Sequence, residues 1–198
     1  MRWEDSFPLG SLVVNGLLLD TNVIYSYVLR DCFVTLGVLG VRIHWSDLIE
    51  AEFIAIRTRK SPNQRAQAHL VLARMRKAIP DYRAIVSKRQ IEALTLPDLD
   101  DRHVLAAAIS ADASIIVTSN RRDFPKSTLD QFGITAMSPD QALCERFDQD
   151  PERMIKAVNN MRGRMVNPPL TFAEWLGRLR KAGGENLAVK LEGFSEQL

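Results

Sequence analysis

The chain has 198 residues, of which 46% are hydrophobic and 25% are charged, and its formal net charge is +2. This composition fits a globular protein with one full-sized core and excludes a disordered chain. No overall basic field indicates a nucleic-acid partner, so the arrangement of the charges has to decide that question.

Near its start the chain offers no segment expected to cross a membrane. The apolar run from Leu12 to Leu19 is broken by Asn15-Gly16, and it is far shorter than the ~20 residues that a membrane span requires. The two cysteines, Cys32 and Cys144, lack CxxC spacing, which favours a reducing compartment. We therefore expect a cytoplasmic protein without a membrane partner.

The first predicted element is a buried strand. Residues 17–19 form a continuous apolar run, which is typical of a strand covered on both faces, as in a parallel sheet. Asp20 follows this strand directly. The next stretch, residues 23–39, predicts a helix that is interrupted near Arg30-Asp31.

A second strand and a helical hairpin come next. Residues 41–45 predict the strand, and Ser46 is a favourable N-cap for the helix that follows. Apolar residues recur at helical spacing after Ser46 and again over residues 62–77. These two helices are expected to form a hairpin.

Alternating helices and strands continue to about residue 138. Residues 101–111 are rich in alanine and predict a helix, and the β-branched run 114–118 predicts a buried strand. A short helix over 127–132 and a strand over 134–137 repeat the pattern. This order predicts an α/β sandwich with a mostly parallel sheet.

Beyond Pro139 only helix signals remain. Thr171 and Glu174 have the spacing of a capping box, and they follow the helix breaker Pro168-Pro169. We expect a nuclease-like domain over residues 1–140 and a helical C-terminal extension over residues 141–198.

Acidic residues stand where an open parallel sheet places its ligands, at the carboxyl ends of its strands. Asp20 follows the first strand, and Asp123 follows strand 114–118 after Asn120. Asp101 opens the alanine-rich helix. Taken singly, each of these acids fits a helix cap, a helix dipole or a turn; their joint placement favours a site.

Two positions in this set have close competitors. Glu50 and Glu52 lie two residues apart on one predicted helix, which separates them by about 200° of rotation, so only one can face a common site. Asp98 and Asp100 stand beside Asp101. We choose Glu52 and Asp101 for the predicted site.

A cation is needed to hold four carboxylates together, because like charges raise one another's pKa and oppose folding. Oxygen ligands without histidine or cysteine select Mg²⁺ or Mn²⁺. Such ions neutralise a phosphodiester and lower the pKa of a bound water, and Thr21 and Asn120 are placed to orient water or phosphate. The three histidines lack metal-ligand spacing and are interpreted as structural or surface residues; they are His44, His69 and His103.

Four segments resemble the motifs of the PIN-domain family, and more narrowly those of VapC-type toxins of bacterial toxin–antitoxin pairs. They read LLLDTNV at 17–23, SDLIEAEF at 46–53, LPDLDDRHVLAAAI at 96–109 and IIVTSNRRDFP at 115–125. The resemblance implies a three-layer α/β/α fold and a Mg²⁺- or Mn²⁺-dependent endoribonuclease. It also implies a cognate antitoxin that lies across the active site. Homodimers are common in the family, and the sequence leaves the oligomeric state open. The family's acidic and companion positions fall on Asp20, Glu52, Asp101, Asp123 and Asn120.

RNA as a substrate has local support from basic residues around the helical hairpin and beside Asp123. They are Arg57, Arg59, Lys60, Arg65, Arg74, Arg76, Lys77, Arg121 and Arg122. Such residues can follow a phosphate backbone while the carboxylates hold a metal ion. A solvated helix face is the simpler interpretation for about half of them.

Three other functions compete with the toxin. A housekeeping PIN-domain ribonuclease would share the same site, and a degenerate PIN domain would serve only as a binding module. A phosphatase with an aspartyl nucleophile is disfavoured, because position 22 is Asn where a second Asp would be expected.

Overall fold

The computed structural model describes residues 16–165 and 169–197, so the apolar residues 12–14 and Pro168 lie outside the described residues. Its centre is a parallel sheet of five strands in the order β3-β2-β1-β4-β5. The strands are β1 (Gly16–Leu19), β2 (Ile43–Ser46), β3 (Arg83–Ala84), β4 (Ala113–Val117) and β5 (Thr135–Met137).

The first strand lies in the middle of the sheet and is fully buried. Leu17, Leu18 and Leu19 have no exposed surface, which confirms the prediction of a strand covered on both faces. The chain first builds β2 and β3 on one side of β1, then crosses to β4 and β5 on the other. The carboxyl ends of β1 and β4 therefore border the point where the strand order reverses, and open α/β sheets bind ligands there.

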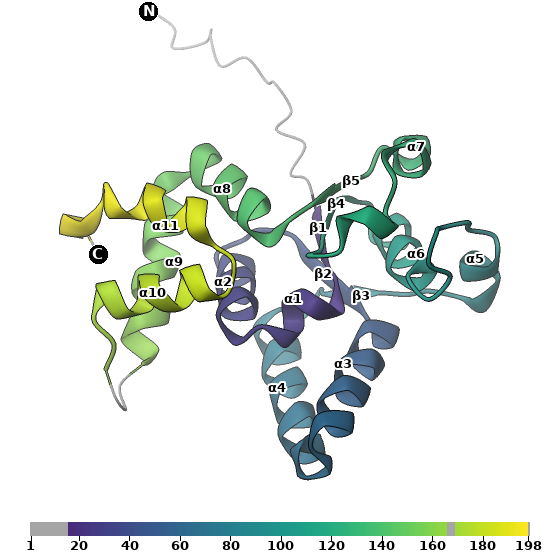
Figure 1. Cartoon of the computed structure of the whole chain (residues 1–198), viewed down its shortest axis with the longest axis horizontal. Helices are drawn as coiled ribbons and strands as arrows, with labels where there is room; N and C mark the ends of the chain where they lie inside the picture. The colour runs from purple at the N-terminus through teal and green to yellow at the C-terminus, as the bar shows by residue number, and fades with distance from the viewer. Residues whose placement is uncertain (1–15, 166–168, 198) are drawn as a thin grey trace, which may run out of the picture.

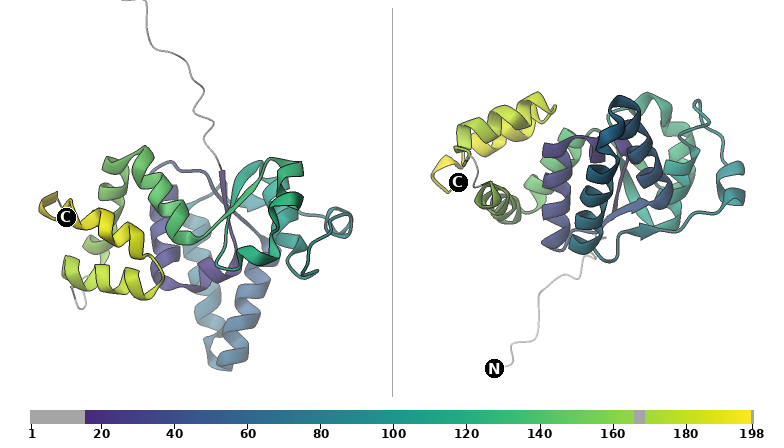
Figure 2. Two further views of the ribbon diagram at one scale, coloured as in Figure 1. Left: turned by 45° about the horizontal axis from the view of Figure 1, so that its top comes forward. Right: turned by 90° about the horizontal axis from the view of Figure 1, so that it is seen from below.

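Helices cover both faces of this sheet. In Figures 1 and 2, α2 (Tyr27–Val38) and α6 (Arg102–Ser110) lie on opposite sides of the strands. The predicted three-layer α/β/α sandwich is therefore correct. Among the described residues, no helix is long and apolar enough to cross a membrane.

The helix expected over residues 23–39 is interrupted at a different place from the one predicted. The break is not near Arg30-Asp31 but at Ser26, whose extended backbone separates α1 (Thr21–Tyr25) from α2. Arg30 stays helical, and its Nη1 donates a 2.7 Å hydrogen bond to the carbonyl of Ile24 in the last turn of α1. This bond satisfies a carbonyl that the break leaves without a helical partner.

The predicted helical hairpin consists of α3 (Asp47–Lys60) and α4 (Arg65–Ala78), and it projects from the sheet in Figure 1. Ser46 is the N-cap of α3 as expected, because its Oγ accepts a 3.3 Å hydrogen bond from the Ile49 amide. A 3₁₀ turn (Pro62–Gln64) joins the two helices.

Two elements were not predicted, and both lie between the hairpin and α6. They are the two-residue strand β3 and the single-turn helix α5 (Lys88–Glu92). Later elements match the prediction: α7 (Lys126–Leu129) and a 3₁₀ turn precede β5. Gly133, between the 3₁₀ turn and β5, has the left-handed φ of 65° that ends the 3₁₀ turn.

The C-terminal helices pack on the side of α2 that faces away from the sheet (Figures 1 and 2). They are α8 (Pro139–Gln149), α9 (Pro151–Arg164), α10 (Phe172–Lys181) and α11 (Glu185–Glu192). Arg164 at the end of α9 binds α2 at two points, with Nη2 3.1 Å from Asp31 Oδ1 and 2.7 Å from Thr35 Oγ1. The capping box of Thr171 and Glu174 is present at the start of α10.

A buried carboxylate joins the first and last helices of this C-terminal group. Asp140 of α8 is 7% exposed. It accepts hydrogen bonds from the Asn186 amide at 3.1 Å, the Asn186 side chain at 2.7 Å and the Leu187 amide at 3.0 Å. The first turn of α11 thus depends on Asp140 for its otherwise unpaired amides.

We predict that Asp140→Ala lowers the free energy of unfolding by about 2–3 kcal/mol, because it leaves buried amide donors without acceptors. Urea denaturation followed by circular dichroism measures this loss. Asp148→Ala is the control, because it removes only the exposed ion pair with Lys190 and should leave the midpoint nearly unchanged. Equal midpoints for the two variants would contradict this role of Asp140.

Candidate active site

Asp20 lies at the carboxyl end of β1 and is almost completely buried, with 5% of its surface exposed. It is the N-cap of α1 and accepts a 2.6 Å hydrogen bond from the Thr21 amide. Burial raises the pKa of Asp20, and the charge of Glu52 adds to this effect, whereas hydrogen bonds from Thr118 and Thr21 oppose it. The capping role that the sequence also allowed is therefore real, and it holds this carboxylate in place.

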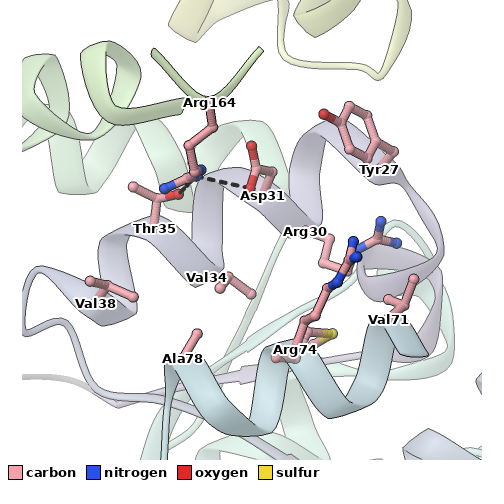
Figure 3. A pocket seen from close by; sticks show the side chains of 11 residues that line it. Tyr27, Arg30, Asp31, Val34, Thr35, Val38, Val71, Arg74, Ala78 and Arg164 are labelled. Carbon is pink, nitrogen blue, oxygen red and sulfur yellow. Dashed lines mark hydrogen bonds and ion pairs between the residues drawn. The ribbon is translucent and has the colours of Figure 1, made fainter. Parts of the chain in front are cut away.

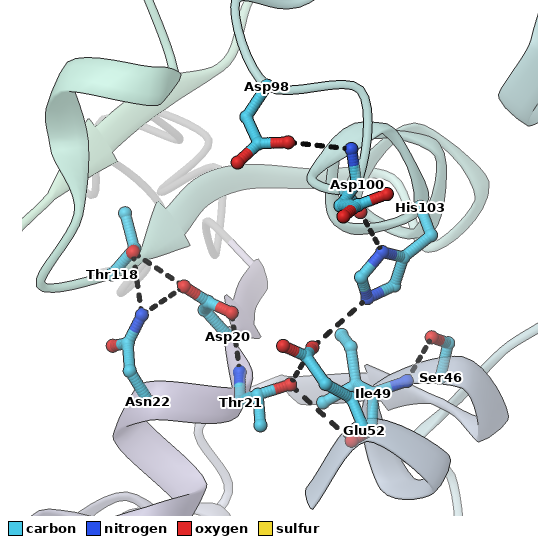
Figure 4. A network of polar contacts seen from close by, with 10 residues as sticks. All are labelled: Asp20, Thr21, Asn22, Ser46, Ile49, Glu52, Asp98, Asp100, His103 and Thr118. Atoms are coloured by element: carbon cyan, nitrogen blue, oxygen red, sulfur yellow. Dashed lines mark hydrogen bonds and ion pairs between the residues drawn. The ribbon is translucent and has the colours of Figure 1, made fainter. Parts of the chain in front are cut away.

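Thr118 and Asn22 connect the ends of β1 and β4 around Asp20 (Figure 4). The Thr118 hydroxyl donates a 2.6 Å hydrogen bond to Asp20 and accepts bonds from Asn22 and from the Asn120 amide. The Asn22 side chain also donates to Asp20, and its Oδ1 accepts from the Ser119 amide at 3.0 Å. Asn22 thus links the ends of two strands. This role requires an amide at position 22, where a phosphatase with an aspartyl nucleophile would need a carboxylate.

Three further carboxylates converge beside Asp20. One oxygen from each of Asp98, Asp101 and Asp123 lies within 4.8 Å of the other two. Asp123 and Asp101 occupy the places that the strand and helix pattern predicted. Asp98 belongs to the loop before α6 and was a competitor of Asp101 in the sequence, whereas the structure brings both of them to one point.

This arrangement disfavours the ionised form of Asp101. Burial, together with the charges of Asp20, Asp98 and Asp123, raises the pKa of Asp101 to about 6. Its Oδ2 is buried and has no hydrogen-bond partner among the described residues. An unpaired carboxylate oxygen among other carboxylates fits a cation ligand, and the oxygen-only donors suit Mg²⁺ or Mn²⁺.

Asn120 is in contact with the acidic group. Its side-chain amide donates a hydrogen bond to Asp123 Oδ2. The adjoining 3₁₀ turn (Arg121–Asp123) carries Asp123 back toward β4. Asn120 therefore fixes the orientation of one carboxylate.

Glu52, rather than Glu50, faces Asp20. Glu52 Oε2 accepts a 2.5 Å hydrogen bond from the Thr21 hydroxyl, so the hydroxyl of Thr21 is engaged with this carboxylate. Glu50 points to the opposite side of α3, where it is buried, accepts a 2.9 Å hydrogen bond from Trp45 Nε1 and pairs with Arg76. The rotation of about 200° between the two residues has given them different environments.

His103 is the residue of this group that sequence reasoning missed. Its Nδ1 lies 2.6 Å from the Asp100 carbonyl and its Nε2 lies 3.5 Å from Glu52 Oε2 (Figure 4). Burial lowers the pKa of His103, but the contacts with Glu52 and the Asp100 carbonyl outweigh burial and raise it. The contact with His103 in turn holds the pKa of Glu52 below its ordinary value.

Asp100 itself contributes backbone rather than a carboxylate to this arrangement. Its amide donates a 2.9 Å hydrogen bond to Asp98 Oδ1, and its carbonyl contacts His103. Of the three neighbouring aspartates, Asp98 and Asp101 thus turn toward Asp123. The backbone of Asp100 links the acidic loop to the imidazole.

A separate cavity of about 390 Å³ lies between α2 and α4 (Figure 3). Apolar residues such as Val34, Val71 and Met75 form part of its wall, and Arg30, Arg74 and Arg164 line it as well. None of the carboxylates described above lines it. The cavity is therefore distinct from the acidic site.

The fold and the acidic group together match what the resemblance to PIN domains implies. A family model described as PIN domain matches residues 16–122, which is more than half of the chain. The chain belongs to the PIN-domain family. A second family model, described as VapC50 C-terminal domain, matches residues 139–192.

One curated relative comes from Mycobacterium tuberculosis (strain ATCC 25618 / H37Rv) and is named "Putative ribonuclease VapC50". It is 38% identical to this chain over 71 residues, which are 36% of this chain and 42% of the relative. The match thus spans less than half the length of that relative. No solved structure matches this chain.

The separate environments of the two glutamates lead to a prediction about stability. Glu50→Ala should lower the free energy of unfolding by about 2–3 kcal/mol, because it leaves the buried Trp45 N–H without an acceptor. Glu52→Ala should cost less, because removing this charge also relieves repulsion on Asp20. Thermal and urea denaturation of both variants measure the difference; a larger loss for Glu52→Ala would contradict the assignment.

Proposed function

We propose that this protein is a Mg²⁺- or Mn²⁺-dependent endoribonuclease that hydrolyses RNA phosphodiester bonds. The observation that carries the proposal is the convergence of Asp98, Asp101 and Asp123 beside Asp20, at the point where the strand order of the sheet reverses. Membership of the PIN-domain family and the name of the curated relative support a ribonuclease. We further propose that it acts in the cytoplasm.

A single divalent ion is the proposed occupant of the acidic group. Asp101 and Asp123 are proposed ligands together with Asp98, and Asp20 and Glu52 complete the site as the sequence suggested. When bound, the ion would supply a Lewis acid that neutralises the phosphate and lowers the pKa of a coordinated water. It would also offset the repulsion that raises the pKa of Asp101.

The protein groups around the ion have separate proposed roles. Glu52, held by Thr21 and His103, is placed to orient the attacking water. Asn120 holds Asp123, and Thr118 holds Asp20. These contacts pre-organise the site, so no carboxylate has to rearrange when substrate binds.

We propose the role of a toxin that a cognate antitoxin inhibits by covering the acidic site. The match of residues 139–192 to the VapC50 C-terminal domain, and the similarity of 71 residues to the curated relative, support this role. We also propose that the nuclease domain ends near residue 140 and that the helices from 141 onward form an extension that braces α2. The contact of Arg164 with Asp31 and Thr35 supports the bracing.

The first functional prediction concerns Asp20. Asp20→Asn removes a negative charge while keeping the shape of the side chain, and it should reduce the cleavage rate of single-stranded RNA by roughly 100-fold or more. Gel analysis of a labelled RNA, with the protein freed of any antitoxin, measures this rate. Asp81→Asn, at an exposed position outside the site, is the matched control, and EDTA should abolish cleavage by the wild type.

Retained cleavage by Asp20→Asn would show that the proposed site is wrong. Cleavage that persists in EDTA would reject the metal dependence separately. Circular dichroism of the variant establishes that its fold is intact, so a lost rate reports on the site and not on unfolding.

The second functional prediction concerns pH. A carboxyl with a pKa of about 6 is mostly ionised at pH 7.5 and mostly protonated at pH 5, and a protonated carboxyl binds metal poorly. Mn²⁺ affinity should therefore fall about tenfold between pH 7.5 and pH 5. Isothermal titration calorimetry measures the Mn²⁺ affinity at each pH. Asp101→Asn should bind more weakly at pH 7.5 and show a flatter profile, whereas equal wild-type affinity at both pH values would contradict the role of Asp101.

A further inference from the structure

The next turn of α1 and α3 beyond Thr21 and Glu52 carries aromatic rings and an arginine. Tyr25 of α1 packs edge-on against Phe53 of α3, with 6.5 Å between the ring centroids. The guanidinium carbon of Arg57 lies 5.5 Å from the Tyr25 centroid and 6.0 Å from the Phe53 centroid. Arg57 follows Glu52 by five residues, which is about 7.5 Å along the helix axis and about 140° around it.

Arg30 of α2 brings a second positive charge to the same place. Burial lowers the pKa of the Arg30 guanidinium and the nearby charge of Arg57 lowers it further, whereas the charge of Asp31 opposes this shift. Its guanidinium lies 5.8 Å from the Tyr27 ring centroid, and one of its nitrogens donates to the Ile24 carbonyl. Two arginines from different helices are therefore held close to each other.

Neither arginine has an ion-pair partner in the part of the chain that the structure describes. Asp31, the neighbour of Arg30, pairs with Arg164. The Nε of Arg57 is buried and lacks a hydrogen-bond partner among the described residues. Partly buried cations without an ion pair cost free energy, and the nearby charge of Asp31 on Arg30 and the contacts with aromatic rings offset only part of this cost.

We propose that Arg57 and Arg30 form a phosphodiester-binding subsite, which holds the RNA backbone next to the phosphate that is cleaved. This inference rests on the proposed function. A guanidinium matches the geometry of a phosphate group, and the rings of Tyr25 and Tyr27 beside the two cations suit the stacking of unpaired bases.

The negative charge of the acidic site explains why RNA binding requires cations nearby. The carboxylates at the sheet edge repel a polyanion, so the free energy of RNA binding has to come from cations beside them. Arg57, about 7.5 Å from Glu52 along the axis of α3, and Arg30 close to it provide two such cations. Arg30 also lines the cavity between α2 and α4 together with Arg74 (Figure 3), so the basic surface continues away from the site.

The test measures RNA binding separately from cleavage. Fluorescence anisotropy with a labelled single-stranded RNA, at several KCl concentrations, is carried out in an Asp20→Asn background. Adding Arg57→Met keeps an apolar side chain on Tyr25 and Phe53 but removes the charge. We expect about tenfold weaker binding and a salt slope that is smaller by about 0.7, the value for one lost phosphate contact on a single strand.

Arg89→Met is the matched control, because Arg89 is an exposed arginine on α5 and should leave affinity and slope unchanged. Arg57→Lys keeps the charge and should retain most of the slope, which separates a lost contact from a disturbed fold. In the cleavage assay with otherwise wild-type protein, Arg57→Met should raise KM with little change in kcat.

Equal affinity and slope for Arg57→Met and Arg89→Met would overturn the subsite. Tighter binding of a labelled acidic peptide than of an RNA of equal charge, lost in Arg57→Met, would also overturn it in favour of a protein ligand. If Asp20→Asn stops cleavage while Arg57→Met leaves the slope intact, the proposed function stands and the subsite fails. The opposite pattern rejects the proposed active site and retains the subsite.

Discussion

Mutual repulsion among carboxylates at the carboxyl edge of the sheet is the constraint on which the other features of the site depend. Burial, together with the nearby charges of Asp20, Asp98 and Asp123, raises the pKa of Asp101 to about 6. Like charges stay this close only when a rigid frame holds them. The fully buried β1 and the largely buried β4, joined in parallel register, supply that frame. Hydrogen-bond donors that follow these strands then fix individual carboxylates.

The other layers hold the frame in the geometry that the site requires. Glu50, bound to Trp45 and Arg76, anchors one face of α3 in the protein, so that Glu52 on the other face meets Asp20. On the far side of the molecule the C-terminal helices pack against α2. The contact of Arg164 with Asp31 ties α9 to this helix. On α3, Glu50 therefore contributes to stability, whereas Glu52, two residues away, contributes to the proposed active site.

The sequence predicted the parts of this molecule that follow from local pattern and strand order. Asp20 and Asp123 could be located because parallel strands end at one edge, and the buried run 17–19 marked the centre of the sheet. Asp98 and His103 could not be assigned, because their partners Asp123 and Glu52 are distant in the sequence. The strand β3 was missed because two residues, Arg83 and Ala84, carry no period. The break was predicted near Arg30-Asp31 but lies at Ser26, where the Ile24 carbonyl finds its partner in the Arg30 side chain, which helical spacing does not reveal.

The central claim is that the carboxylates converge in order to bind a divalent cation. The most direct measurement is anomalous X-ray diffraction from crystals grown with Mn²⁺ near pH 7.5, where Asp101 is ionised. A manganese peak bounded by oxygens of Asp98, Asp101 and Asp123, and absent in Asp101→Asn crystals, is the predicted result. Crystals saturated with Mn²⁺ that show no peak among these carboxylates, or a peak that Asp101→Asn leaves unchanged, would contradict the account.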